Sequence, residues 1–324
     1  MVEKIYCEVC TPSIHLQITM STNGQIGARE PVEAGTDYSR ICSVLRTALL
    51  AARNKDGAWG YAPARRSRIE PTCWVALALG HSAGQPPDVQ SLGSWPRQDD
   101  WLLDVPGTPP NAAFNALAAL TFLQAPSAAA LAQPMVNRLI QTSGRRFGQN
   151  DAVRQDNSIQ AWSWVDGTAS WVEPTAWCLL ALKKIRSRLR SREADERIQA
   201  GEQFLFDRVC YDGGWNYGNK EVYGRKLWPY VPTTALALLA MRDHRDHSVV
   251  ARSLEQLQKD VASERSVVAL ALTIICLRAY GVETYALEQT VIGLWTLGDR
   301  DNLLSTAMML YALADANRQV AFTV

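Results

Sequence analysis

The chain has 324 residues, with 33 Lys and Arg against 32 Asp and Glu, and its formal net charge is +1 at pH 7. This balance excludes a strong overall field that would draw the protein onto nucleic acid or an anionic membrane, so we expect no nucleic-acid partner. Hydrophobic residues make up 47% of the sequence, which is ample for a core, and the 11 Trp are many for this length.

Seven Cys are scattered along the chain, and the N-terminal residues MVEKIYCEVC contain no apolar leader segment. An odd number of cysteines without such a leader indicates reduced thiols, and we therefore expect a cytoplasmic protein. The longest uncharged apolar stretch, residues 267–277, is shorter than the ~20 residues that a membrane-spanning helix needs. We expect no transmembrane segment, and a peripheral contact with a membrane surface stays open.

Residues 1–37 precede the first helical pattern, and we expect them to form an N-terminal arm that is at most partly ordered. The arm contains Cys7 and Cys10, followed by His15, but no second pair of ligands follows at zinc-finger spacing. No shift in composition and no linker divides the remainder, so we expect residues 38–324 to form one domain. We expect neither a metal ion nor a cofactor.

Six apolar stretches predict helices that are hydrophobic nearly all round. The three clearest share a Pro-Thr start and an Ala- and Leu-rich continuation: IEPTCWVALAL at 69–79, VEPTAWCLLAL at 172–182 and YVPTTALALLAM at 230–241. Proline suits the first helical position, where its missing N–H would lack a partner anyway, and Ala and Leu favour helix over strand. Three weaker copies lie at 110–120, 266–277 and 304–313.

Six amphipathic stretches alternate with these, at 38–54, 87–95, 127–141, 192–209, 245–260 and 281–297. A helix with one polar face belongs at a surface, whereas a helix that is apolar all round belongs inside. Their alternation predicts an inner ring of helices wrapped by an outer ring. We therefore predict an all-α fold, a single (α/α)6 toroid.

Two similar turns, DGAWGYA at 56–62 and DGGWNYG at 212–218, join an outer helix to the next inner helix. Asp and Gly tolerate positive φ, and Trp can pack across the helix ends. A third turn, IQAWSWVDGTASW at 159–171, is longer and carries three Trp. We interpret these turns as structural joints between repeats.

In these turns the sequence resembles the terpenoid cyclase and protein prenyltransferase superfamily, whose repeats carry a Gln followed by Gly-x-Trp. Gln203 with GGW at 213–215 fits that pattern, and GAW at 57–59 fits it with Arg53 near the place of the Gln. The resemblance implies a toroid that binds an isoprenoid or polyene in an aromatic-lined central cavity. It also implies acid-initiated cyclisation, an isomerase-type reaction.

The chain lacks both active-site signatures of that superfamily. The Asp-x-Asp-Asp motif of class II cyclases is missing, and a near string, DRDN at 299–302, places Asp301 before an inner helix. The Asp-x-Cys pair that holds zinc in protein prenyltransferases is missing from the region LWPYVPTTA. Asp301 is a candidate acid, and its structural alternative is a helix cap or a partner of the helix dipole.

Glu70 and Glu173 are the other candidate catalytic acids, because each stands directly before the proline of an inner-helix start. In a toroid these helix ends surround one mouth of the central cavity, where a carboxyl group can act as an acid or a ligand. The alternative is structural. A carboxylate at a helix N-terminus gains about 0.3–1 kcal/mol from the helix dipole, and the dipole lowers its pKa.

Six aromatic residues are candidates for substrate binding: Trp74, Phe114, Trp177, Tyr217, Trp228 and Tyr230. The first three follow inner-helix starts, so they either form an aromatic cavity wall or pack in the core. The last three lie between the DGGW turn and the next inner helix, where they either cover the mouth or pack as ordinary loop residues.

The leading hypothesis is thus a cyclase with an apolar, isoprenoid-type ligand. Two alternatives are a non-catalytic toroid that binds an apolar ligand or a partner protein, and a carbohydrate-processing toroid enzyme. The latter needs paired carboxylates, for which Asp99, Asp100 and Asp104 are candidates. A closed aromatic chamber favours cyclisation, an open acidic groove favours sugars, and a cavity plugged by side chains favours the binding role.

Overall fold

The computed structural model describes residues 38–149, 151–298, 300–314 and 321–322. Backbone contacts divide the chain into Met1–Gly35 and Thr36–Val324, and the description below concerns the second unit. The predicted N-terminal arm, residues 1–37, lies outside the described residues.

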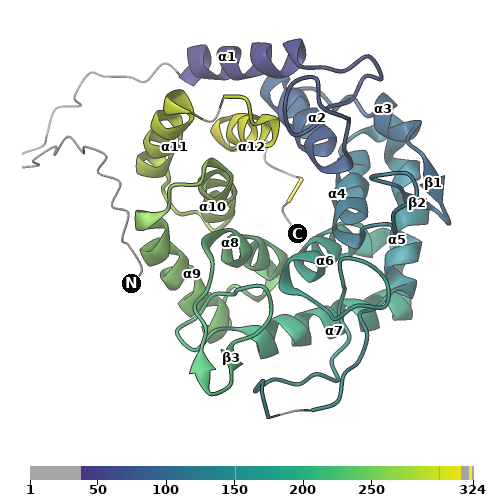
Figure 1. Ribbon diagram of the computed structural model, residues 1–324, viewed down its shortest axis with the longest axis vertical. Coiled ribbons are helices and arrows are strands. Elements are labelled where there is room, and N and C mark those ends of the chain that lie inside the picture. Colours follow the sequence, from purple (N-terminus) through teal and green to yellow (C-terminus); the bar gives the residue numbers. More distant parts are fainter. Residues whose placement is uncertain (1–37, 150, 299, 315–320, 323–324) are drawn as a thin grey trace, which may run out of the picture. The chain divides into compact units, whose positions relative to one another are not determined.

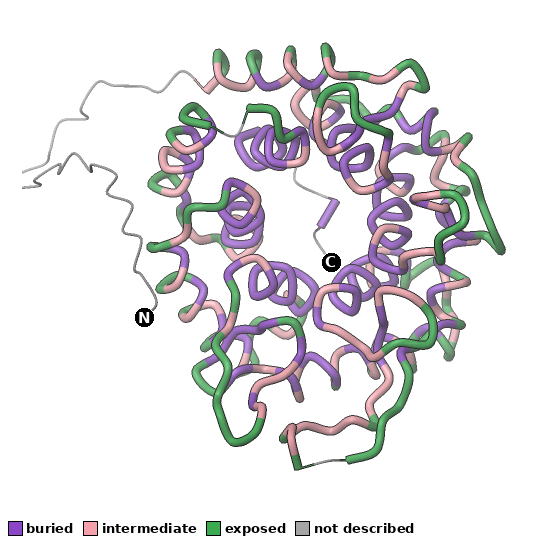
Figure 2. Tube along the Cα trace, viewed as in Figure 1, coloured by how far each residue is buried: buried purple, intermediate pink, exposed green. Residues whose placement is uncertain are grey.

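An inner ring of six helices forms the centre of the described part (Figure 1). Each inner helix contacts the next, and the last contacts the first, so the ring is closed. Its members are α2 (Ile69–Ala83), α4 (Ala112–Leu123), α6 (Val172–Leu189), α8 (Val231–Ala240), α10 (Val267–Ala279) and α12 (Leu303–Leu313). Figure 2 shows these helices as mostly buried, which agrees with sequences that are apolar on every face.

The outer ring contains the amphipathic helices and a few short elements. Its helices are α1 (Tyr38–Ala51), α3 (Gln90–Gly93), α5 (Ala132–Gln141), α7 (Arg192–Arg208), α9 (Ser248–Asp260) and α11 (Tyr285–Leu297). Three short 3₁₀ helices accompany them: η1 (Pro126–Leu131), η2 (Arg242–His244) and η3 (Val261–Ser263). The predicted all-α toroid is confirmed.

Two small hairpins interrupt the helical pattern and were not predicted. Strands β1 (Arg97–Gln98) and β2 (Trp101–Leu102) pair next to the short α3, and β3 (Glu221–Val222) pairs with β4 (Arg225–Lys226). Strands of two residues are too short to leave a hydrophobic alternation in the sequence. The predicted helix at 87–95 is correspondingly reduced to the four residues of α3.

Hydrogen bonds to a threonine and to the preceding outer helix fix the Trp of each joint. In the DGGW turn, Trp215 N–H donates to Thr234 Oγ1 (2.9 Å), and this hydroxyl donates back to Trp215 O (3.1 Å). The indole Nε1 donates to Leu205 O at the end of α7 (2.7 Å). The same contacts join Trp59 to Thr72 and Leu49, and Trp162 to Thr175 and Leu139. The three Trp are therefore structural, as the repeated turns predict.

Glycine is required within the DGGW turn for two reasons. Gly214 has φ +73°, in the left-handed region, and a Cβ there would lie 2.8 Å from the Pro229 side chain.

The threonine of the joint also sets the true alignment of the repeats. Thr234 is the fourth residue of α8, so Pro232, the second residue, stands where α2 and α6 carry Glu70 and Glu173. The third strong copy thus lacks the carboxyl group.

Replacing Thr175 by Val tests the joint. The substitution preserves the side-chain shape but leaves the buried N–H of Trp162 without its threonine acceptor, whereas Trp162 O still accepts from Trp171 N–H. An unsatisfied buried polar group costs about 1–3 kcal/mol, so the free energy of unfolding should fall by about 2 kcal/mol or more in urea titrations. The matched control is Thr121→Val, because the buried Thr121 hydroxyl donates to Leu117 O within its own helix and does not join a turn to a helix start. Equal losses in the two variants would contradict this role.

Among the described residues, no helix combines the length and apolarity required to cross a membrane.

Candidate functional site

The inner helices begin at one end of the ring, called here the N-terminal mouth. Turn carbonyls cap these helix starts: Val172 N–H of α6 donates to Tyr217 O (3.0 Å), and Leu303 N–H of α12 donates to Tyr61 O (2.9 Å). Glu70 and Glu173, the second residues of α2 and α6, therefore lie at the same mouth. Both side chains are half-buried.

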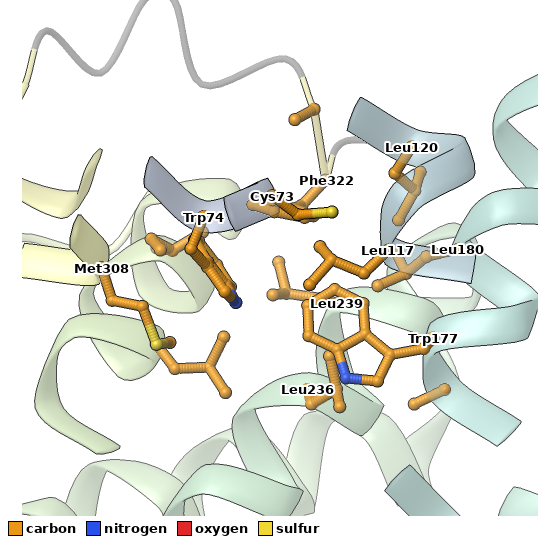
Figure 3. Packing of buried hydrophobic residues seen from close by; sticks show 14 of the residues in the cluster. Cys73, Trp74, Leu117, Leu120, Trp177, Leu180, Leu236, Leu239, Met308 and Phe322 are labelled. Atoms are coloured by element: carbon orange, nitrogen blue, oxygen red, sulfur yellow. The ribbon is translucent and has the colours of Figure 1, made fainter. Parts of the chain in front are cut away.

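Two tryptophans lie one helical turn deeper, below the carboxyl groups. Trp74 and Trp177 follow Glu70 and Glu173 by four residues, a spacing that places side chains on one helix face. Their rings meet edge to face with centroids 6.1 Å apart, although α2 and α6 are separated by α4 in the ring. The two rings therefore face the barrel axis, where Figure 3 shows them with Leu117, Leu236 and Met308.

The barrel axis between these tryptophans is occupied. The Phe322 ring lies 5.1 Å from the Trp74 ring and 5.7 Å from the Trp177 ring, and it is 1% exposed. The aromatic wall thus surrounds a side chain rather than an open chamber. Phe114 is the third residue of α4 and only half-buried. The residue of α4 at the same helix position as Trp74 and Trp177 is Leu117.

Burial dominates the acidity of Glu173. The pKa of this carboxyl is raised from 4.5 to about 7, mainly by burial and in smaller part by the nearby charge of Glu70. The dipole of α6 would lower the pKa, so burial outweighs it. The helix dipole alone therefore does not explain the acidity of Glu173.

Glu70 has partners that Glu173 lacks within the described residues. Tyr61 Oη donates to Glu70 Oε2 (2.6 Å), and this bond and the Arg68 charge favour the ionised carboxylate. Burial still raises the pKa of Glu70, and the Asp104 charge adds to it. The two carboxyl groups therefore share one mouth but differ in their surroundings.

The other predicted acidic residues are placed differently. Asp104 is buried, accepts hydrogen bonds from Arg68 Nε (2.7 Å) and Ile69 N–H (2.8 Å), and so holds the start of α2. Asp99 and Asp100 are exposed in the turn of the β1–β2 hairpin, whereas Asp104 is buried. Asp301 is exposed before α12 and therefore lacks the burial of the other two candidate acids.

Exposed aromatic rings stand beside the helix that carries Glu173. The rings of Tyr217 and Tyr230 lie 5.2 Å apart and are 54% and 48% exposed, and Trp228 is 71% exposed. Tyr217 O accepts the first N–H of α6, and Tyr230 caps α8. The three residues thus form an aromatic rim at the N-terminal mouth.

A group of possible metal ligands lies elsewhere. Glu202, Asp243 and His244 offer ligand atoms within 4.8 Å of one another. The Lys183 ammonium lies 2.7 Å from Glu202 and 2.6 Å from Asp243, so a lysine already supplies the positive charge at this position. The residues therefore fit an ion-pair network better than a metal centre.

No protein-family model and no curated protein matches the chain. Solved structures of glycoside hydrolases have a similar fold. Rex8A from Paenibacillus barcinonensis in complex with xylose has a TM-score of 0.54 at 8% identity, over 90% of this chain and 95% of that chain. A family 76 glycoside hydrolase from a bovine Bacteroides thetaiotaomicron strain has a TM-score of 0.55 at 10% identity, over 86% and 77%. A mutant reducing-end-xylose releasing exo-oligoxylanase has a TM-score of 0.56 at 10% identity, over 90% and 94%.

These structures overturn the expected superfamily and chemistry. The similar toroids are glycoside hydrolases, one of them solved with xylose, so the terpenoid cyclase or prenyltransferase assignment, the isoprenoid ligand and the cyclisation are wrong. The reason is that the Gly-x-Trp turns are joints of an α/α toroid and carry no chemistry of their own. Gln203, the expected Gln of the pattern, is exposed on α7, whereas Arg53 lies 5.1 Å from the Trp59 ring.

Proposed function

We propose that this protein is a glycoside hydrolase whose paired carboxyl groups are Glu70 and Glu173. The observation that supports this most is a carboxyl group with a pKa of about 7, Glu173, in the electrostatic field of a second carboxyl at the same mouth. Glycosidic bonds are cleaved by two carboxyl groups, one of which must keep its proton near neutral pH. The fold shared with glycoside hydrolases adds support by analogy.

In this mechanism Glu173 is the general acid. Its proton passes to the glycosidic oxygen as the bond from that oxygen to the anomeric carbon breaks. Glu70, held by the Tyr61 hydroxyl, then acts in one of two ways. As a base it takes a proton from the water that attacks the anomeric carbon, giving inversion. As a nucleophile it forms a glycosyl ester that water later hydrolyses, giving retention.

The exposed rim residues Tyr217, Trp228 and Tyr230 are proposed to bind the sugar. Trp74 and Trp177 are 1% and 6% exposed and pack around Phe322, so they support the carboxyl pair from below. Aromatic faces supply large apolar contact areas, while the carboxyl groups and the Tyr61 hydroxyl supply hydrogen bonds, which suits a ligand with both apolar and polar faces. Xylo-oligosaccharides are the first substrates to test, because one enzyme with a similar structure is a reducing-end-xylose releasing exo-oligoxylanase.

The function is tested by incubating the protein with xylo-oligosaccharides and other neutral oligosaccharides of defined length, followed by product analysis. We expect new reducing ends, and proton NMR of the first product shows whether the anomeric configuration is inverted or retained. A double variant, Glu70→Gln with Glu173→Gln, should produce none. No product from any oligosaccharide would contradict the proposal.

A second candidate is a toroid that binds carbohydrate without cleaving it. Phe322 favours this role, because it fills the axis and leaves the carboxyl pair only the mouth for contact with a ligand. Calorimetric binding of an oligosaccharide without any product would support this candidate over hydrolysis.

We also propose that the protein works in the cytoplasm. Its five described cysteines, Cys42, Cys73, Cys178, Cys210 and Cys276, are free, which suits a reducing compartment.

A further inference from the structure

Phe322 reaches the barrel axis from the end opposite the carboxyl pair. Its neighbour Ala321 lines a cavity of about 240 Å³ together with Leu77, His81 and Tyr311. His81 lies in the last turn of α2, and Tyr311 lies in the last turn of α12, so this cavity belongs to the end where the inner helices finish. The Phe322 ring therefore stands between that cavity and the N-terminal mouth.

The contacts of Phe322 connect it to the candidate site. Its ring touches Trp74 and Trp177, which lie one turn below Glu70 and Glu173, and it also lies 5.4 Å from the Tyr311 ring. Figure 3 shows Phe322 among side chains that come from several inner helices. Phe322 thus adds a ring to those that Trp74, Trp177 and Tyr311 supply from the inner helices.

We propose that Phe322 is a positioning and specificity-determining residue of the site, whose ring forms the floor beneath the Glu70 and Glu173 carboxyl groups. The floor closes the barrel to water from the far end and limits how deep a bound sugar can reach. The second consequence rests on the proposed function, whereas the first does not.

The alternative is that Phe322 merely fills the core. The two roles differ in what happens when the ring is removed. A void at Phe322 would join the cavity lined by Ala321 and admit water toward the carboxyl pair from below. A void left by a buried Phe away from the axis would remain closed. Phe122 of α4, which is 0% exposed and lies outside the set of rings that touch Phe322, provides that comparison.

The water-exclusion role has a direct readout in Glu173. Burial is the main cause of the raised pKa of this carboxyl, and Glu70 is the charged group that adds to it among the described residues. Water that enters from the far end would lower the pKa of Glu173 toward 4.5, its ordinary value. A change of packing alone would not.

The experiment compares Phe322→Ala, Phe322→Leu and Phe122→Ala by ¹³C NMR titration of the glutamate carboxyl groups and by thermal denaturation, each with and without toluene. We expect all three to lose thermal stability. Only the Phe322 variants should show a lower Glu173 midpoint, Phe322→Ala more than Phe322→Leu, and toluene should restore the midpoint by filling the void. If Phe322→Ala does not fold, Phe322→Leu decides by the same criterion.

An unchanged Glu173 midpoint in the folded Phe322 variants would overturn the proposal and leave Phe322 as a core residue. Equal midpoint changes in Phe122→Ala would overturn it as well. Lack of glycoside cleavage by the wild-type protein would instead contradict the proposed function. The NMR titration of Glu173 does not depend on activity, so its result could still be interpreted. The two failures are therefore distinguishable.

Discussion

Replacing Glu173 by Gln is expected to lower kcat for oligosaccharide hydrolysis by about 10²- to 10⁴-fold, the usual contribution of a general acid. Gln preserves the shape of the side chain and the contacts of α6, so KM should change little. The wild-type rate should fall as pH rises through about 7, because Glu173 then loses its proton. The variant should lack this decline.

The loss should depend on the leaving group. A glycoside with a good leaving group, such as a dinitrophenyl glycoside, departs without protonation, so Glu173→Gln should cleave it nearly as fast as wild type does. Glu70→Gln is the matched comparison and should remain slow on both kinds of substrate, because the base or nucleophile is needed in either case. Equal losses of Glu173→Gln on both substrates would contradict its role as acid.

The second large effect concerns stability and is independent of any substrate. Glu173→Gln should be more stable than wild type by about 3 kcal/mol at pH 8 and nearly equal to it at pH 4. The folded state holds the Glu173 proton up to a pKa of about 7, whereas the unfolded chain releases it near 4.5. Between these values the folded state binds more protons, so wild-type stability falls as pH rises. A pKa difference of this size corresponds to about 3 kcal/mol.

Urea denaturation at the two pH values measures this difference. The control is Glu255→Gln on α9, because Glu255 is exposed and a surface substitution usually changes stability by less than about 0.5 kcal/mol. A Glu173→Gln variant that is no more stable than wild type at pH 8 would show that the folded protein does not disfavour the ionised carboxylate. The proposed acid would then have no physical basis.

The sequence was sufficient to predict the ring of helices. Helical periodicity is a local pattern, and here inner and outer helices differ in composition, so their alternation is visible without any tertiary information. The repeats also brought Glu70 and Glu173 to one mouth, because they stand at the same position of two inner helices. An alignment on the shared proline places the α8 start one residue out of step with α2 and α6. The correct alignment matches the threonines that bond to the joint tryptophans.

The occupied axis could not be predicted in this way. Ala321 and Phe322 follow the last inner helix without any periodic pattern, and their contacts with α2 and α6 are distant in sequence. The hydrogen bond from Tyr61 to Glu70 joins a turn to a helix start and likewise leaves no pattern. The expected cyclisation is wrong because it followed from a resemblance based on Gly-x-Trp turns, which join helices and have no chemistry of their own.

The pairing of the two carboxyl groups is tested most directly by ¹³C NMR titration of Glu173 in the wild-type protein and in Glu70→Gln. We predict a midpoint of about 7 in the wild type and a lower one in the variant, because the Glu70 charge contributes to the raised pKa. A wild-type midpoint near 4.5, or one that Glu70→Gln leaves unchanged, would contradict a shared acid pair at the N-terminal mouth.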